Sequence, residues 1–138
     1  MEEIEVWKEV NEFPKYKVST MGNVMSYKYN EPRILKKNKN DRGYYNVKLY
    51  NKFKSKIFRI NRLVAITFLP NYYNLPDVDH KDRNRQNNSL YNLRWVSKRQ
   101  NEENKKTYIS EITEKDPLKR SKLYRKFDIE SKRYSCNV

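Results

Sequence analysis

The stretch DVDHKDRNRQNNSLYNLRWVS, residues 77–97, holds the only histidine of the chain, His80, directly after Asp79. Hydrolysis of a phosphodiester needs a base that takes a proton from water near neutral pH, and an imidazole with a pKa of about 6.5 suits that task. The reaction also gains from a divalent metal, which offsets the charge that builds on the phosphate. The residue types therefore allow metal-assisted phosphodiester hydrolysis.

The roles divide between these side chains and Asn101, which follows the stretch. Hard cations such as Mg²⁺ take carboxylate and amide oxygens, which Asp79 and Asn101 could supply. An amide cannot act as a base, so the base would be His80. Neighbours on a strand face opposite sides, so one of Asp79 and His80 must lie at a strand end or a bend if they share a site.

The asparagines after His80 are expected to shape the loop. Asn92 could bond loop backbone and hold the surroundings of His80 in place, and Asn87 and Asn88 could do the same. The alternative is a surface histidine in a loop of turn-forming residues. Spacing alone does not decide between a catalytic site and this simpler arrangement.

Regular elements should frame this loop. PDVDH and NLRWVS have the character of strands on either side of KDRNRQNNSLY. Ser97 followed by Gln100 has the form of a capping box, so a helix should begin at Lys98. Upstream, NRLVAITFLP (61–70) predicts a short apolar helix that ends at Pro70. From residue 77 to about 106 the predicted order is therefore strand, loop, strand, helix.

The N-terminal half predicts antiparallel strands. YKVS and NVMSY are expected to pair around the turn TMGN, where Gly22 takes a backbone shape that other residues avoid. A short strand is expected at Arg33–Lys36. GYYNVKLYN (43–51) alternates as a strand does, and KSKIFRI (54–60) should complete a hairpin with it. Four aromatic residues are expected in the core: Trp7, Phe13, Tyr16 and Trp95.

The charge of the chain favours a polyanion as partner. Its 138 residues carry a formal net charge of +14, which is typical of proteins that bind nucleic acid. A single cysteine, Cys136, excludes an internal disulfide and a cysteine-based zinc site. The acidic start MEEIEV does not resemble a signal peptide, and no apolar run approaches the ~20 residues of a membrane span. We therefore expect an intracellular protein with access to DNA and no membrane partner.

The stretch DHKDRNRQNNSLYNLRWVSKRQNEEN resembles the HNH homing endonuclease family in its His-Asn-Asn form. INRLVAITFLPN (60–71) is similar to the helix that precedes this motif in the family. EVWKEVNEFPKYKVSTMGNVMSY (5–27) resembles the nuclease-associated modular domain that is often fused in front. The two blocks stand in the expected order, so the resemblance is more specific than a single HNH-like string.

The resemblance implies a ββα-metal fold, in which two antiparallel strands and a helix hold one divalent ion. Carried over by position, His80 is the general base, Asp79 and Asn101 are the metal ligands, and Asn92 is the middle residue that holds the loop. The ion would be Mg²⁺ in the first place, with Mn²⁺ as an alternative. Two positions depart from the family pattern: Arg83 stands where glycine is frequent, and Asn61 where histidine is.

The expected partner is double-stranded DNA. Basic residues around the presumed centre would face phosphates, while one face of the 43–60 hairpin could lie against a groove. The expected contacts are Arg83, Arg85, Arg94, Lys98 and Arg99 around the centre, and Tyr44, Asn46, Lys48 and Arg59 on the hairpin. The protein would act as a monomer or a homodimer.

These inferences add up to an α+β protein in three segments. Residues 1–58 would form an antiparallel β region that contacts DNA, residues 59–106 the ββα-metal nuclease module, and residues 107–138 a short basic helical tail with a helix at 117–127. The expected function is metal-dependent cleavage of DNA, by nicking or by cutting both strands. The alternative is an inactive relative of such nucleases that only binds nucleic acid.

Overall fold

The computed structural model describes residues 4–115 in two compact units, one within residues 1–96 and one within residues 97–138. The first unit contains the helix α1 (Ile60–Phe68) and a single 3₁₀ turn, η1 (Leu90–Asn92). The described part of the second unit is the helix α2 (Lys98–Lys115). The strands of the first unit are β1 (Trp7–Val10), β2 (Phe13–Ser19), β3 (Val24–Ser26), β4 (Arg33–Ile34), β5 (Asn38–Lys39), β6 (Tyr45–Tyr50), β7 (Ser55–Arg59), β8 (Asp77–His80) and β9 (Leu93–Val96).

The strands form three antiparallel sheets. Their orders are β1-β2-β3-β4, β5-β6-β7 and β8-β9. The hairpins expected around TMGN, over 43–60 and around the polar loop are therefore confirmed, as is the α+β class. In β6 the alternation predicts one buried face, and Val47 and Leu49 are indeed buried while Lys48 is exposed.

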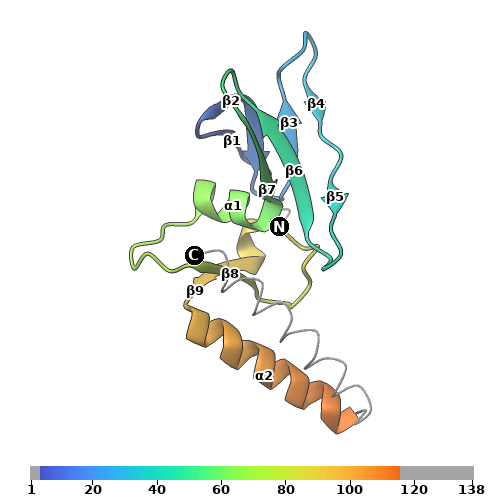
Figure 1. Ribbon diagram of the computed structural model, residues 1–138, viewed down its shortest axis with the longest axis vertical. Helices are drawn as coiled ribbons and strands as arrows, with labels where there is room; N and C mark the ends of the chain where they lie inside the picture. Colours follow the sequence, from blue (N-terminus) through green and yellow to red (C-terminus); the bar gives the residue numbers. More distant parts are fainter. Residues whose placement is uncertain (1–3, 116–138) are drawn as a thin grey trace. The chain divides into compact units, whose positions relative to one another are not determined.

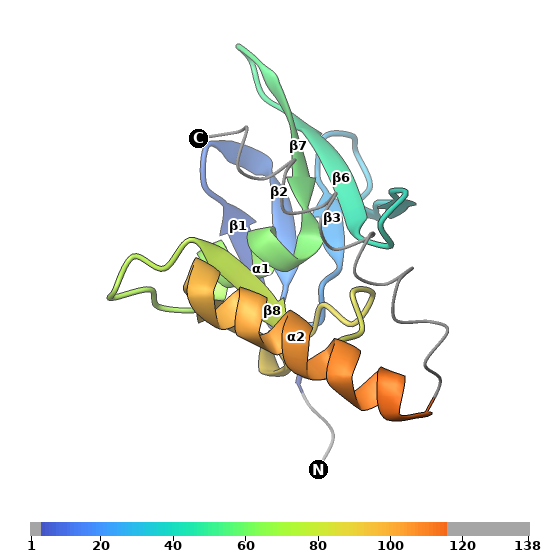
Figure 2. The same ribbon diagram turned by 60° about the horizontal axis from the view of Figure 1, so that its bottom comes forward.

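Helix α1 joins the sheets to the β8–β9 hairpin. It contacts β2, β6 and β7 on one side and β8 and β9 on another, and Figure 1 and Figure 2 both show it between these elements. Ile60, Leu63 and Val64 are buried, whereas Ile66 is exposed, so the helix is apolar over most of its circumference. It ends just before Pro70, as expected, because proline cannot continue the helical hydrogen bonds.

One hydrophobic core spans the first unit. It contains Phe13 and Val18 of the N-terminal strands, Leu49 of β6, Leu63 of α1 and Leu93 of β9. The N-terminal region and the β8–β9 hairpin therefore bury apolar surface against shared neighbours, which couples their stabilities. The segment predicted at 1–58 and the part of the segment predicted at 59–106 that lies in the first unit therefore share this core.

The aromatic residues divide into two groups. Phe13 and Tyr16 are buried, as predicted, and Phe13 packs edge-to-face on Phe58 with 5.5 Å between ring centroids. Trp7 and Trp95 are partly exposed and lie outside the core cluster. Trp95 instead uses its indole N–H, which donates to the Leu69 carbonyl at 3.2 Å. The prediction that both tryptophans are core residues is therefore wrong.

Helix α2 begins where the capping box predicts. The Ser97 N–H donates to Gln100 Oε1 at 2.9 Å, and the Gln100 N–H donates to Ser97 Oγ at 3.1 Å. The helix continues to Lys115, past the segment boundary expected at residue 106, and the helix predicted at 117–127 lies outside the described residues. No helix in the described part of the chain is long and apolar enough to cross a membrane.

A shared core predicts that the first unit unfolds as one. Phe13→Ala should lower the free energy of unfolding by about 3–5 kcal/mol, because it leaves a cavity at a fully buried position. Urea denaturation followed by circular dichroism measures this. The native NMR signal of His80, at the end of β8, should be lost at the same lowered midpoint. A native His80 signal that outlasts the N-terminal sheet would contradict a common core.

Candidate active site

The β8–β9 hairpin sorts the candidate residues onto two faces. His80 lies opposite Leu93, and Asp79 lies opposite Arg94. His80 and Leu93 are both buried, while Asp79 and Arg94 form the next cross-strand pair. His80 is also the last residue of β8, so the expected position at a strand end is confirmed.

His80 is held by a buried amide. Its Nε2 lies 2.8 Å from Asn88 Oδ1, and the two residues are only 5% and 4% exposed. An amide oxygen can only accept a hydrogen bond, so the neutral ring carries its proton on Nε2 and its lone pair on Nδ1. Asn88 was expected to bond loop backbone, which is wrong. It holds the histidine itself.

Burial changes the protonation of His80. Desolvation lowers the pKa of the imidazole, because burial penalises its charged form, and the charge of Arg85 acts in the same direction. The hydrogen bond to Asn88 and the charges of Asp79 and Asp82 oppose this shift, but the pKa still lies below its ordinary value. The neutral, proton-accepting form therefore dominates at neutral pH.

Asp79 is engaged by its cross-strand neighbour. Arg94 Nη2 and Nε reach Asp79 Oδ2 at 2.8 and 2.9 Å, and the Asp79 side chain is 17% exposed. Arg94 was expected to face a phosphate, and in this structure it binds the carboxylate instead. A metal ion at Asp79 would therefore meet a carboxylate that already has a cationic partner.

Asn92 organises the loop after His80, as predicted. Its Oδ1 accepts from the Asp82 N–H at 3.1 Å, and its Nδ2 donates to the Asn87 carbonyl and to Asp82 Oδ1, both at 2.8 Å. Partial desolvation raises the pKa of Asp82, but hydrogen bonds from Asn87, Asn84 and Asn92 outweigh it and lower that pKa. Asp82 is thus the anionic centre around which the amides fold the loop.

The departure from the family pattern at Arg83 has a backbone consequence. Arg83 adopts φ +62°, in the left-handed region that glycine occupies most easily. Its N–H donates to the His80 carbonyl at 2.9 Å, which closes a tight turn directly after the histidine. The loop therefore keeps the shape that glycine would allow, at some cost in backbone strain.

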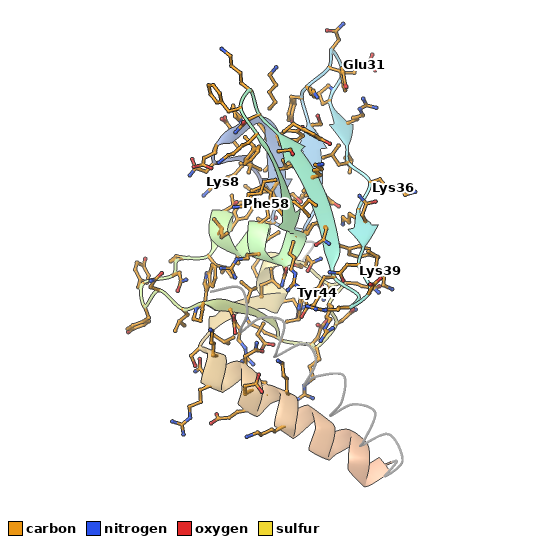
Figure 3. The ribbon with its side chains drawn as sticks, in the orientation of Figure 1. Lys8, Glu31, Lys36, Lys39, Tyr44 and Phe58 are labelled. Carbon is orange, nitrogen blue, oxygen red and sulfur yellow. The ribbon has the colours of Figure 1, made fainter. Side chains whose placement is uncertain are left out.

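Tyr44 joins the 43–60 hairpin to the site. It directly precedes β6 (Figure 3), and its ring centroid lies 6.1 Å from that of His80. The guanidinium groups of Arg59 and Arg85 lie 4.4 and 4.7 Å from the Tyr44 ring centroid. Arg85 also donates to the Arg42 carbonyl at 2.7 Å. Three of the predicted DNA contacts therefore gather beside His80.

The remaining predicted contacts are arranged differently. Lys48 is exposed and lies over the ring of Tyr50 at 5.5 Å. Asn46 has its Oδ1 buried without a hydrogen-bond partner, which does not suit a side chain expected to face a groove.

In the second unit, Lys98 is exposed and Arg99 pairs with Glu103 at 3.3 Å. Asn101 lies in the first turns of α2, where its N–H donates to the Ser97 carbonyl at 3.0 Å.

The donor chemistry fits a hard cation. Asp79 offers a carboxylate and Asn101 an amide oxygen, which are the ligand types that Mg²⁺ takes together with waters and phosphate. Among residues 4–106, whose side chains the structure describes, no group of three or more His, Cys, Asp or Glu side chains could hold a metal alone.

Two features of this site were missed in the sequence. They are the hydrogen bond between Asn88 and His80 and the amides around Asp82. The sequence alone does not show which amide binds the histidine or which acid the amides surround. One signal was available: a lone histidine in an otherwise basic chain needs an acceptor when it is buried. Asn84, Gln86, Asn87 and Asn88 all offered amide oxygens soon after His80 in the sequence.

Comparison with known protein families agrees with the order of elements. The NUMOD4 motif matches residues 5–50, and an HNH endonuclease family matches residues 61–103. DNA endonuclease I-HmuI of Bacillus phage SP01 is 40% identical over 99 residues, which are 71% of this chain and 56% of that protein. H-N-H endonuclease F-TflII of Escherichia phage T5 is 37% identical over 97 residues, 69% of this chain and 49% of that protein.

A solved structure is similar as well. It is described as DNA binding and cleavage by the HNH homing endonuclease I-HmuI, and it matches with a TM-score of 0.68 at 38% identity. The match covers 75% of this chain and 59% of that chain. The chain thus spans about half the length of the two phage relatives named above.

The lowered pKa of His80 predicts acid sensitivity. The unfolded chain binds a proton at an ordinary histidine pKa of about 6.5, whereas the folded chain resists it, so stability is lost as pH falls below that value. NMR titration of the metal-free protein should place the His80 pKa below about 6.5. In urea denaturation, the wild type should lose more unfolding free energy between neutral pH and about pH 5.5 than His80→Gln does. A His80 pKa at or above its ordinary value would contradict the burial argument.

The strained turn at Arg83 gives a second prediction. Arg83→Gly should raise the free energy of unfolding by up to about 1 kcal/mol, because relief of the left-handed strain exceeds the added entropy of the unfolded chain. Arg83→Ala removes the same charge and keeps the strain, so it should bring no gain. Thermal unfolding of the three proteins measures this, and a loss of stability in Arg83→Gly alone would contradict it.

Proposed function

Because residues 61–103 match an HNH endonuclease family and residues 5–50 match the NUMOD4 motif ahead of it, we propose that the chain is a metal-dependent DNA endonuclease of the homing type. The main support for this proposal is the hydrogen bond that holds the His80 ring. Its Nε2 is occupied by Asn88 at 2.8 Å, which leaves Nδ1 with the lone pair. In this role His80 takes a proton from the attacking water through Nδ1 as general base.

Asp79 and Asn101 are the proposed metal ligands. Their positions in the motif and their oxygen donors support this role, and Mg²⁺ is the preferred ion, with Mn²⁺ as an alternative. When bound, a divalent ion offsets the negative charge that develops on the phosphate and the leaving oxygen. Asn101 belongs to the second unit, so its pairing with Asp79 is a prediction from the motif. Release of Asp79 from Arg94 would then make that guanidinium available for a phosphate.

Double-stranded DNA is the proposed substrate. The proposed phosphate contacts near the reacting bond are Arg59 and Arg85. Their guanidinium groups lie over the ring of Tyr44 beside His80, which supports this role. Stacking on an aromatic ring restricts each guanidinium, so less freedom is lost when a phosphate binds. Further phosphate contacts are proposed for Arg83 next to the centre, Lys48 on the hairpin, and Lys98 and Arg99 on α2.

The number of catalytic histidines limits the reaction. One His80 per chain provides one base, so a monomer is proposed to nick one strand, and cleavage of both strands would need a homodimer or two binding events. The reaction would take place inside a cell, where the protein meets DNA. The competing function is an inactive nucleic-acid-binding protein, which the pairing of Asp79 with Arg94 favours, since that pair occupies a proposed metal ligand.

A nicking assay separates these two functions. Supercoiled plasmid with Mg²⁺ or Mn²⁺ should be nicked by the wild type, and His80→Ala should lower the rate by about 10²–10⁴-fold, the usual contribution of a general base. Its affinity for DNA without metal should stay within a small factor of the wild type, and both affinities should fall with salt. Nicking that survives His80→Ala, or salt-sensitive binding without any cleavage, would decide against the proposed enzyme.

A further inference from the structure

The turn between β2 and β3 lies against the amide that holds His80. Gly22 adopts φ +81°, and a Cβ built on it would meet Asn88 Cβ at 2.9 Å and the Asn88 carbonyl oxygen at 3.0 Å. Next to this contact, the Leu90 N–H donates to the Thr20 carbonyl at 2.7 Å. Two independent constraints thus demand glycine here: the positive φ and the closeness of a neighbouring backbone.

The turn itself is firmly held. Ser19 Oγ accepts from the N–H groups of Met21 and Asn23 at 3.2 and 3.0 Å, and the Ser19 N–H donates to the Asn23 carbonyl at 2.8 Å. Thr20 exchanges hydrogen bonds with Val6 of the preceding segment, at 2.9 Å through its N–H and 3.1 Å through Oγ1. Ser19 and Thr20 are both buried. The surface that meets Asn88 is therefore rigid.

Asn88 sits between this surface and the imidazole. It is 4% exposed, it contacts Gly22 through its Cβ and carbonyl oxygen, and its Oδ1 lies 2.8 Å from His80 Nε2. Because the turn meets the Cβ and the main-chain carbonyl of Asn88, it holds the base of the side chain that carries the amide. The amide in turn fixes the ring orientation and leaves the lone pair on Nδ1.

We propose that Asn88 is a positioning residue for His80, and that the Gly22 turn is the support that keeps Asn88 in place. The N-terminal region then contributes to catalysis through the position of His80, beyond any contact it makes with DNA. This inference rests on the proposed role of His80 as general base. Neither Asn88 nor Gly22 touches the substrate, so both act through the geometry and tautomer of the imidazole.

The tautomer can be read without DNA or metal, because His80 is the only histidine. ¹⁵N NMR of the metal-free full chain at pH 8, where the ring is neutral, should show the proton on Nε2. Asn88→Ala and Gly22→Ala should convert this to a mixture of tautomers, whereas Asn88→Asp, which keeps an acceptor oxygen, should retain it. An unchanged tautomer in Asn88→Ala would overturn the proposal.

Gly43→Ala is the matched control for backbone strain. Gly43 has φ +83°, close to that of Gly22, but the nearest atom to its added Cβ is the flexible end of Lys39 at 4.0 Å. Gly43→Ala should lose as much stability from backbone strain as Gly22→Ala does, and it should keep the Nε2–H tautomer. A mixture of tautomers in Gly43→Ala would mean that strain alone disturbs the ring, which would overturn the role of the Gly22 contact. Circular dichroism checks folding, and Asn88→Leu replaces Asn88→Ala if the latter does not fold.

Kinetics then test the catalytic consequence. Single-turnover nicking should fall roughly 10- to 100-fold in Asn88→Ala and Gly22→Ala, since a small misplacement of a reacting group has an effect of that order. The dissociation constant for DNA should not change, and Asn88→Asp should recover most of the rate. A changed tautomer with an unchanged rate would overturn the positioning role. A wild type with the Nε2–H tautomer that cuts no DNA would instead contradict the proposed function.

Discussion

The buried hydrogen bond between His80 and Asn88 is the contact on which the rest of the site depends. An imidazole placed at the end of a short strand could adopt several orientations, and this bond selects one of them and one tautomer. The amide can do so only because the Gly22 turn supports it from behind. The N-terminal sheet, the loop and the β8–β9 hairpin therefore form one mechanical unit around a single side chain.

The same arrangement explains the electrostatics. Burial keeps His80 neutral, while Arg59 and Arg85 keep positive charge next to it on the ring of Tyr44. A neutral imidazole beside cations would suit the proposed reaction, in which an anionic phosphate approaches and water loses a proton. Asp79, one residue before His80, is paired with Arg94 of the neighbouring strand.

Much of the framework follows from the sequence. Alternation in 43–51, the capping box at Ser97 and the apolar run at 61–70 depend on local rules, and the structure agrees with each of them. The role of Asn92 in the loop was also predictable, because its position before a strand leaves it near loop backbone. The partner of His80 was not, since it depends on a contact between segments more than sixty positions apart in the chain, Gly22 and Asn88. Strand alternation also could not predict that Asn46 Oδ1 is buried, because this depends on tertiary packing.

A crystal structure of the full chain with a duplex that contains a mapped nick site, and with Ca²⁺ in place of the active ion, tests the role of His80 most directly. The scissile phosphate should lie on the Nδ1 side of His80, while Nε2 still donates to Asn88 against the Gly22 turn. A phosphate bound away from His80, or an imidazole rotated off Asn88 in the complex, would contradict it.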